Sequence, residues 1–251
     1  MSTLSLDKVC KSFGGVVAAK DVSISVPAGR VTGIIGPNGA GKTTLINLIT
    51  GMLSLSSGRI DLDNVELTRA SATEVGRHGV ARTFQNMRLR GEASVIDNIM
   101  IGYHRLETSS LVSNFLGLPS SRRENARTRQ RAREMLARFG MAQYEDHPAG
   151  SLAYGHQRRS DMMRALAAQP RVLLLDEPVA GMNDVEAAEL GDIFRNVAND
   201  GVAVLVIEHN MRFITQISDY LYVLDRGNII AQGLPRDVLA NPAVISAYLG
   251  D

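Results

Sequence analysis

Short apolar, β-branched runs alternate with helical patterns along much of this chain. The runs at residues 30–35, 172–175 and 202–207 are largely apolar, as strands covered on both faces are. The first leads into a glycine-rich turn and then an apolar helical segment, 45–49, which stops at Gly51. Strands that alternate with helices in this way predict an α/β fold with a parallel sheet.

Three other regions depart from this alternation. Near the start, runs at 4–9 and 22–26 predict an antiparallel β subdomain, and residues 220–233 predict two more short strands around a turn. From about 87 to 168, β-branched runs are rare and apolar residues recur at helical spacing. We therefore expect a helical subdomain inserted into the α/β core.

Composition narrows the class of protein. The chain has 251 residues, is 45% hydrophobic and has a net charge of +1, which argues against a dedicated nucleic-acid binder. Its one cysteine, Cys10, fits a reducing compartment. No apolar run is long enough to cross a bilayer and no secretory signal is visible, so we expect a cytoplasmic protein.

The segment 122–138 holds seven arginines. A nucleic-acid contact is one interpretation. Glu124 and Glu134 are interspersed, however, no aromatic residue is interleaved, and an apolar stripe gives the helix a core to face. We therefore favour a solvated helix face.

The most specific signal is the sequence GPNGAGKT at residues 36–43, which fits G-x-x-x-x-G-K-[ST] between a strand and a helix. In such a P-loop, backbone N–H groups and the helix N-terminus surround phosphates. Lys42 would reach the β- and γ-phosphates and Thr43 would offer its hydroxyl to Mg²⁺. Lys42 is also one of only four lysines among 27 basic residues. Because the chain otherwise uses arginine, a lysine in this loop favours phosphate binding by its compact ammonium group.

Polar residues follow two other buried strands. Asp176 and Glu177 come directly after the run 172–175, where Asp176 would hold Mg²⁺ and Glu177 would polarise an attacking water. His209 follows the run 202–207 and would reach the same sheet edge, where it could bond a γ-phosphate or that water. The other histidines show no metal-ligand spacing, so no zinc site is expected.

Taken together, these residues resemble the ATP-binding subunits of ABC transporters over essentially the whole chain. Beyond the P-loop and the LLLDE strand, residues 82–85 (RTFQ) resemble the Q-loop and 151–159 (SLAYGHQRR) the signature segment. Residues 180–183 resemble the D-loop, and 207–209 end on the switch histidine. The family's order is preserved throughout.

Further details resemble the branched-chain (hydrophobic) amino acid importer branch, which implies a subunit that energises import of such an amino acid or a related small organic solute. They are the segments KSFGGVVAAKDVS and RTFQNMRL, the insertion around 103–119, SLAYGHQRR, and the closing residues 247–250. Phe13 matches the aromatic of the adenine-stacking loop, although an ordinary core aromatic is the alternative.

The resemblance implies a single ABC ATPase domain over residues 1–251, with a RecA-like P-loop NTPase core that binds ATP and Mg²⁺. The implied catalytic residues are Glu177, His209 and Gln85, and the implied metal-holding residues are Thr43, Gln85 and Asp176. The implied nucleotide-binding residues are Phe13, Gly36, Asn38, Gly39, Ala40, Gly41, Lys42, Thr43, Thr44, Ala153, Tyr154, Gly155 and His156.

It also implies partners. Two ATPase subunits, alike or different, would close head to tail with each ATP between one P-loop and the other signature, and Gln85 would relay the γ-phosphate to transmembrane permease subunits. An extracytoplasmic solute-binding protein would take part indirectly, and no nucleic-acid partner is expected. The chain would lie peripherally at the cytoplasmic face of the inner or plasma membrane.

Two residues depart from the family's usual signature: Ala153 replaces a serine and His156 a glutamine. One hydroxyl toward the γ-phosphate is therefore absent, and we expect backbone amides to make the contact. Two alternatives to an importer remain open from the sequence: an exporter or lipid-extraction ATPase, which would share every catalytic residue, and a soluble ABC-type ATPase acting on nucleic acid or ribosomes.

Overall fold

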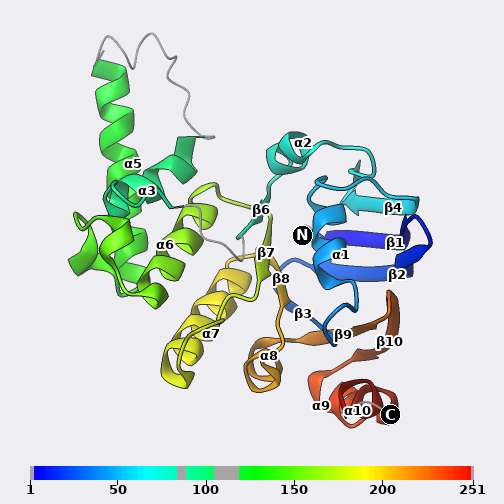
Figure 1. Ribbon diagram of the computed structural model, residues 1–251. Coiled ribbons are helices and arrows are strands. Elements are labelled where there is room, and N and C mark those ends of the chain that lie inside the picture. The colour runs from blue at the N-terminus through cyan, green and yellow to red at the C-terminus, as the bar shows by residue number, and fades with distance from the viewer. Residues whose placement is uncertain (1–2, 84–88, 105–118, 250–251) are drawn as a thin grey trace. The chain divides into compact units, whose positions relative to one another are not determined.

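The computed structural model describes residues 3–83, 89–104 and 119–249 (Figure 1). The chain forms two compact units: residues 1–85 with 171–251, called here the core unit, and residues 86–170, called the helical unit. Each unit is described separately. That residues 1–251 act as a single ATPase domain stays a prediction.

A six-stranded sheet forms the centre of the core unit, in the order β10-β9-β3-β8-β7-β6. Neighbouring strands are parallel except for the antiparallel pair of β9 and β10. The strands are β3 (Val31–Ile35), β6 (Val80–Arg82), β7 (Val172–Asp176), β8 (Ala203–Ile207), β9 (Tyr220–Asp225) and β10 (Asn228–Gly233). The prediction of a parallel sheet is confirmed.

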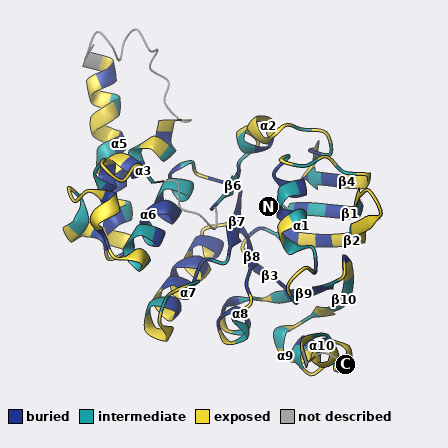
Figure 2. Ribbon diagram, in the orientation of Figure 1, coloured by how far each residue is buried: buried dark blue, intermediate teal, exposed yellow. Residues whose placement is uncertain are grey.

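The strand register explains where polar residues gather. Every residue of β3, β7 and β8 is buried (Figure 2), which accounts for their apolar sequences, since each buried leucine or valine contributes roughly 1.5–3 kcal/mol. Asp176 pairs with Ile207, and Ile34 also pairs with Ile207. The three strands therefore end side by side, and the residues after them share one sheet edge.

A second, antiparallel sheet has the order β2-β1-β4-β5. Its strands are β1 (Thr3–Phe13), β2 (Val16–Pro27), β4 (Ser57–Leu62) and β5 (Val65–Glu66). The first two confirm the predicted N-terminal strands and are longer than their apolar runs. The other two were not predicted, because β4 has only two buried side chains, Ile60 and Leu62.

Helices complete the core unit: α1 (Lys42–Ile49), α2 (Ala72–Arg77), α7 (Asp184–Asn199), α8 (Met211–Ile217), α9 (Pro235–Leu239) and α10 (Pro242–Leu249). Helix α7 buries Leu190 and Phe194 and packs against β8, β3 and α8. The rings of Phe194 and Phe213 meet edge to face, 6.4 Å apart, which links α7 to α8.

The helical unit contains α3 (Val95–Tyr103), α5 (Pro119–Arg138) and α6 (Tyr154–Ala167), with short 3₁₀ turns at Ala142–Tyr144 and Ala149–Ser151. Ala132, Leu136 and Phe139 are fully or almost fully buried, which confirms the apolar stripe predicted for this segment. Within the described ranges, no helix combines the length and the apolar character needed to cross a bilayer.

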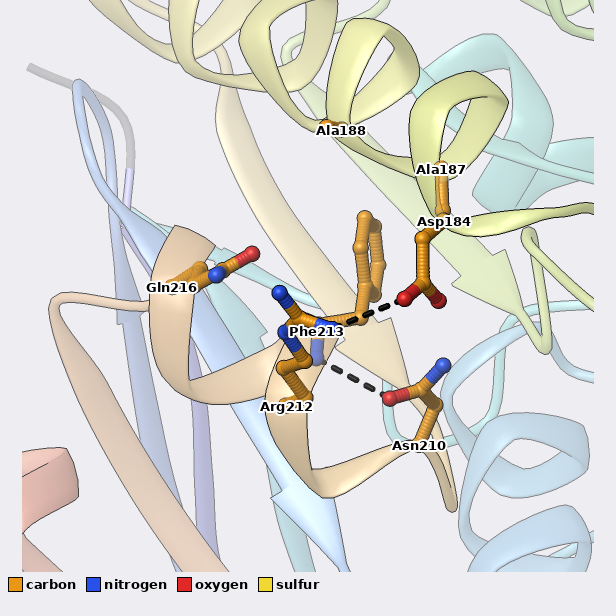
Figure 3. A pocket seen from close by; sticks show the side chains of 7 residues that line it. All are labelled: Asp184, Ala187, Ala188, Asn210, Arg212, Phe213 and Gln216. Carbon is orange, nitrogen blue, oxygen red and sulfur yellow. Dashed lines mark hydrogen bonds and ion pairs between the residues drawn. The ribbon is translucent and has the colours of Figure 1, made fainter.

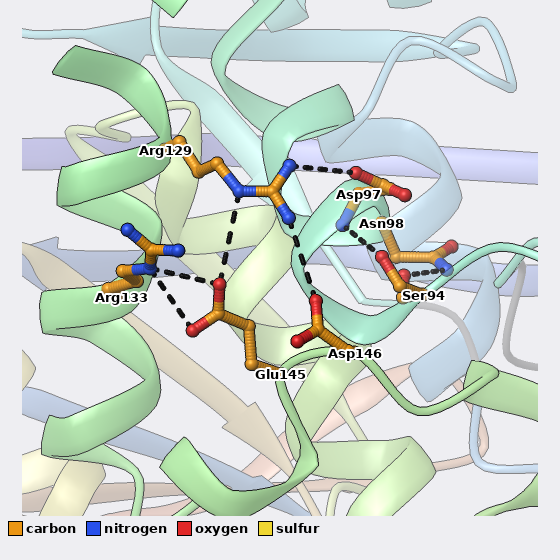
Figure 4. A network of polar contacts seen from close by, with 7 residues as sticks. All are labelled: Ser94, Asp97, Asn98, Arg129, Arg133, Glu145 and Asp146. Carbon is orange, nitrogen blue, oxygen red and sulfur yellow. Dashed lines mark hydrogen bonds and ion pairs between the residues drawn. The ribbon is translucent and has the colours of Figure 1, made fainter. Parts of the chain in front are cut away.

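Arginines of α5 lie in a polar network inside the helical unit (Figure 4). Arg133 Nε donates to both carboxylate oxygens of Glu145, at 2.9 and 3.1 Å. Arg129 lies 3.7 Å from Asp97 and 3.6 Å from Asp146. These two arginines therefore join α5 to α3 and to the turn before α6, which accounts for part of the segment's basic character.

Candidate nucleotide site

The glycine-rich loop between β3 and α1 adopts a backbone that two of its glycines require. Gly36 and Gly41 have φ angles of 154° and 104°. A Cβ atom on either would overlap a carbonyl oxygen, that of Leu224 for Gly36 and that of Ala18 for Gly41. Side chains are therefore excluded at both ends of the loop, and consecutive N–H groups can turn toward a common centre.

Lys42, the first residue of α1, points back over this loop. Its Nζ donates to the carbonyl oxygens of Gly36 and Pro37, at 2.7 and 2.9 Å. Burial lowers the pKa of Lys42 from its ordinary value, while the charges of Glu177 and Asp176 act in the opposite direction. The ammonium group is thus partly desolvated, faces two carboxylates, and can exchange carbonyl partners for phosphate oxygens.

The two carboxylates lie at the end of β7, as the sequence predicts. Asp176 is the last residue of the strand and is 6% exposed. Glu177 follows in the left-handed region, with φ of 48°, and its N–H donates to Ile207 O at 2.9 Å. A non-glycine residue in this conformation stores strain that the surrounding structure must hold, and such residues concentrate at functional sites.

His209 reaches the same edge from the neighbouring strand β8. Its Nδ1 lies 3.6 Å from Glu177 Oε1 and 3.9 Å from Glu208 Oε2. Glu208 is fully buried and accepts the N–H groups of Val179, His209 and Asn210 at 3.1, 3.1 and 3.3 Å. Burial raises the pKa of Glu208, and these hydrogen bonds oppose the rise. The sequence did not indicate this anchoring role.

Helices α7 and α8 begin beside each other after the D-loop and the switch histidine (Figure 3). Asn183 caps α7 through the N–H groups of Val185 and Glu186, and Asn210 caps α8 through that of Phe213. Asp184 and Arg212 join the two helix starts at 2.8 Å. Both are exposed, so the pair contributes only about 0–1 kcal/mol.

Phe13, predicted to stack on adenine, is the last residue of β1 and is 46% exposed. Lys11 Nζ lies 5.0 Å from the centre of its ring. The ring is therefore no core aromatic, and its exposed surface suits stacking on a flat base.

The predicted signature residues lie in the helical unit, at the start of α6. Ala153 is the N-cap, and Tyr154, Gly155 and His156 form the first turn. The N–H groups of a first turn have no partner within their helix and can bind anions. The ring of His156 packs at 4.6 Å against that of Tyr144, so its side chain is engaged inside the unit.

Residues of helix α10 and of the P-loop line a common cavity, an arrangement that sequence reasoning missed. The cavity has a volume of about 500 Å³ and is lined by Pro37, Asn38, Gly39, Ala40, Asp225, Arg226, Ile230, Ala243, Ser246 and Ala247. Burial raises the pKa of the Tyr248 phenol, and a hydrogen bond with the backbone of Gly36 opposes the rise. The only sequence signal was the apolar and aromatic character of the closing segment.

The donor set is suited to Mg²⁺. Thr43 offers a hydroxyl on the first turn of α1 and Asp176 a carboxylate at the same sheet edge, and hard oxygen ligands with phosphate are what Mg²⁺ prefers. Among the described ranges, no group of three or more His, Cys, Asp or Glu could hold a metal by itself. Gln85, predicted as a further ligand, lies outside the described residues.

Comparison with known proteins assigns the class. Residues 19–180 match the family model described as "ABC transporter", and residues 228–251 match that described as "Branched-chain amino acid ATP-binding cassette transporter". The chain therefore belongs to the ABC transporter family of ATP-binding, ATP-hydrolysing cassettes.

Particular relatives cover almost the whole chain. It is 38% identical over 249 residues to the high-affinity branched-chain amino acid transport ATP-binding protein LivG of Escherichia coli strain K12, covering 99% of this chain and 98% of that protein. It is 36% identical, with the same coverage, to BraF of Pseudomonas aeruginosa. A crystal structure of a nucleotide-free ATP-binding cassette from an ABC transporter matches with a TM-score of 0.86 and 34% identity, covering all of both chains.

Proposed function

We propose that this chain energises the import of branched-chain or related hydrophobic amino acids, from the cytoplasmic face of the membrane and bound to permease subunits. The observation that carries the proposal is the end-to-end likeness to LivG and BraF, together with the match of residues 228–251 to the branched-chain model. The cargo does not touch the nucleotide site, so the site's geometry supports the energy-coupling step alone.

In that step, the P-loop amides and the N-terminus of α1 bind the phosphates of ATP, with Thr44 in the first helical turn. Lys42 moves its hydrogen bonds from the carbonyls of Gly36 and Pro37 to the β- and γ-phosphates. Thr43 and Asp176 would hold Mg²⁺, which would neutralise part of the charge on the phosphates. Phe13 stacks on the adenine ring.

Glu177 acts on the attacking water. The water oxygen bonds to the γ-phosphorus as the bond to the β–γ bridging oxygen breaks, and Glu177 accepts the proton that the water loses. His209, 3.6 Å from Glu177, orients that water or the γ-phosphate through its ring N–H. Gln85, outside the described residues, is proposed to sense the γ-phosphate.

A second cassette completes the site. The first turn of α6, with Ala153, Tyr154, Gly155 and His156, would face the γ-phosphate bound to the partner cassette's P-loop. ATP would then bridge the closed dimer, and closure would move the permease subunits. Hydrolysis would remove the phosphate that bridges the two cassettes, so that the dimer can open. A solute-binding protein outside the membrane would deliver the cargo.

The proposal is tested in two stages with one control variant. A tag on this subunit should recover two multi-spanning permease subunits and a second ATPase from native membranes. In a strain lacking the gene, uptake of radiolabelled leucine, isoleucine and valine should return with the wild type. Lys42→Ala should assemble equally but neither bind ATP nor restore uptake, and undiminished ATP affinity would contradict the P-loop assignment.

One alternative has support of its own. The chain is 30% identical over 251 residues to the lipopolysaccharide export system ATP-binding protein LptB of E. coli, with 98% of that protein covered. Recovery of permeases without any effect on amino acid uptake would favour export. Recovery of ribosomes or nucleic acid in place of permeases would contradict both transport functions.

A further inference from the structure

Arg82, the last residue of β6, joins three elements of the core unit through its guanidinium group. Nη1 donates to Asn47 Oδ1 at 2.6 Å, and Nη2 donates to Asp176 Oδ2 at 3.0 Å. The side chains of Arg82 and Asp176 are each only 9% exposed. A largely buried ionic contact thus links an edge strand to α1 and to the end of β7.

Both acceptors are close to the residues proposed to hold Mg²⁺. Asp176 is one of those residues. Asn47 lies on α1 four residues after the other, Thr43, so the two side chains share a helix face one turn apart. Arg82 therefore contacts one metal-holding residue directly and the helix that carries the second.

Stability by itself explains this arrangement poorly. Removing two charges from water costs free energy that their attraction often fails to recover, so buried ion pairs are weak stabilising devices. The planar guanidinium group, however, presents several donors in fixed directions and can hold two acceptors at a set separation. This property suits orientation of the Asp176 carboxylate relative to α1.

We propose that Arg82 is a positioning residue for the magnesium site, which fixes the carboxylate of Asp176 against helix α1 before nucleotide binds. The inference rests on the proposed roles of Asp176 and Thr43. Arg82 acts through Asp176 and does not itself touch the reacting atoms. Its positive charge, together with that of Lys42, also balances the carboxylates of Asp176 and Glu177 while no cation is bound.

The test measures how much Mg²⁺ strengthens nucleotide binding. Calorimetry gives the Kd of ADP in EDTA and in excess Mg²⁺. The Kd in EDTA divided by the Kd in Mg²⁺ reports metal coordination separately from phosphate binding. In Arg82→Ala, we expect this ratio to fall by about tenfold, the size of effect seen when groups that orient metal ligands are lost. Affinity in EDTA should stay within about threefold, because the P-loop is unchanged.

Two further variants and one control complete the design. Arg82→Lys keeps the charge but offers one compact donor group, and Asn47→Ala removes one of the two acceptors, so both should give intermediate ratios. Arg59→Ala removes an exposed arginine that pairs with Asp61 on β4, and it should keep the wild-type ratio. Thermal unfolding identifies the variants that fold.

The outcomes separate the inference from the function it rests on. A wild-type ratio in folded Arg82→Ala overturns the positioning role. If that variant does not fold, wild-type ratios in both Arg82→Lys and Asn47→Ala overturn it. An equal loss of affinity with and without Mg²⁺ indicates a merely structural role and also overturns it. A wild-type protein whose ADP binding ignores Mg²⁺ contradicts the proposed metal site itself.

Discussion

Nδ1 of His209 lies 3.6 Å from Oε1 of Glu177, although 32 residues separate them in the chain. They follow adjacent parallel strands whose register pairs Asp176 with Ile207. The N–H of Glu177 also donates to Ile207 O, so its left-handed backbone is held by the strand that carries His209. The carboxylate is therefore positioned by backbone geometry before any ligand arrives.

Glu177→Gln should bind ATP with affinity within about threefold of the wild type but lose at least about 100-fold in turnover. Glutamine keeps the shape and the backbone anchor, but it cannot accept the proton of the attacking water. Steady-state phosphate release and ATP calorimetry measure the two quantities. Glu66→Gln, at an exposed position of strand β5, is the control. Wild-type turnover in Glu177→Gln would refute the role of general base.

The sequence was informative where function and folding used contiguous residues. The run 172–175 is apolar because both faces of β7 are buried, and the residue after it must emerge at the sheet edge, so Asp176 and Glu177 could be placed without a structure. The loop from Gly36 to Lys42 is likewise a local feature. The predicted outline of the sheet and of the P-loop therefore agrees with the structure.

Contacts between distant residues could not be predicted. Arg82 is 35 residues from Asn47 and 94 from Asp176, and nothing in the pattern of β6 marks an arginine that turns inward. Glu208 would be expected at the surface after a strand, yet it is fully buried because three backbone N–H groups converge on it. Such positions follow from the packing of several elements together.

A matched pair of glycine substitutions should separate backbone strain from steric overlap in the P-loop. Gly39 and Gly41 both have positive φ, but a Cβ at Gly39 has open space while one at Gly41 overlaps the backbone of Ala18. Gly39→Ala should lower the free energy of unfolding by about 1–2 kcal/mol, because alanine is strained in the left-handed region. Gly41→Ala should lower it by clearly more, because the overlap with Ala18 is added to that strain. Urea unfolding without nucleotide measures both. Equal losses would contradict the overlap at Gly41.

Glu208 predicts a particular dependence of stability on pH. Burial raises its folded pKa above its ordinary value of 4.5, so the folded protein binds the proton more tightly than the unfolded chain. Its contribution to stability is then complete below pH 4.5 and is lost as pH rises through the raised folded pKa. Glu208→Gln should remove this slope and, by placing an amide donor among N–H donors, cost about 1–3 kcal/mol.

Glu74 is the control for Glu208, because its pKa is shifted in the opposite direction. Hydrogen bonds from Ser71 lower the pKa of the exposed Glu74, so its contribution is present above the ordinary value and is lost as pH falls. Urea unfolding between about pH 4.5 and 8 compares both glutamine variants with the wild type. The stability advantage of the wild type over Glu208→Gln should shrink with rising pH, whereas its advantage over Glu74→Gln should not. If the free energy of unfolding varies with pH in the same way in the wild type and in Glu208→Gln, the raised pKa of Glu208 is contradicted.

Ala153→Ser should stabilise the helical unit by about 0.5–2 kcal/mol. Ala153 is the N-cap of α6, with φ of −57° and ψ of 150°, and makes no side-chain capping bond. Ser94, the N-cap of α3, has φ of −63° and ψ of 160°, and its hydroxyl accepts the N–H of Asp97. The backbone at position 153 therefore already has the conformation from which a serine hydroxyl caps a helix. The same hydroxyl would restore the one that the family usually directs toward the γ-phosphate.

Ala137→Ser makes the same exchange at an exposed position within α5, where serine is a poorer helix former than alanine, so its stability should fall by a few tenths of a kcal/mol. If urea unfolding shows that the free energy of unfolding rises in Ala153→Ser and falls in Ala137→Ser, the capping effect at position 153 is established. ATPase activity of Ala153→Ser should equal or exceed that of the wild type, because the backbone amides of α6 are retained and one hydrogen-bond donor is gained. A large loss of activity in a stabilised Ala153→Ser would instead mean that the closed dimer requires alanine at this helix start.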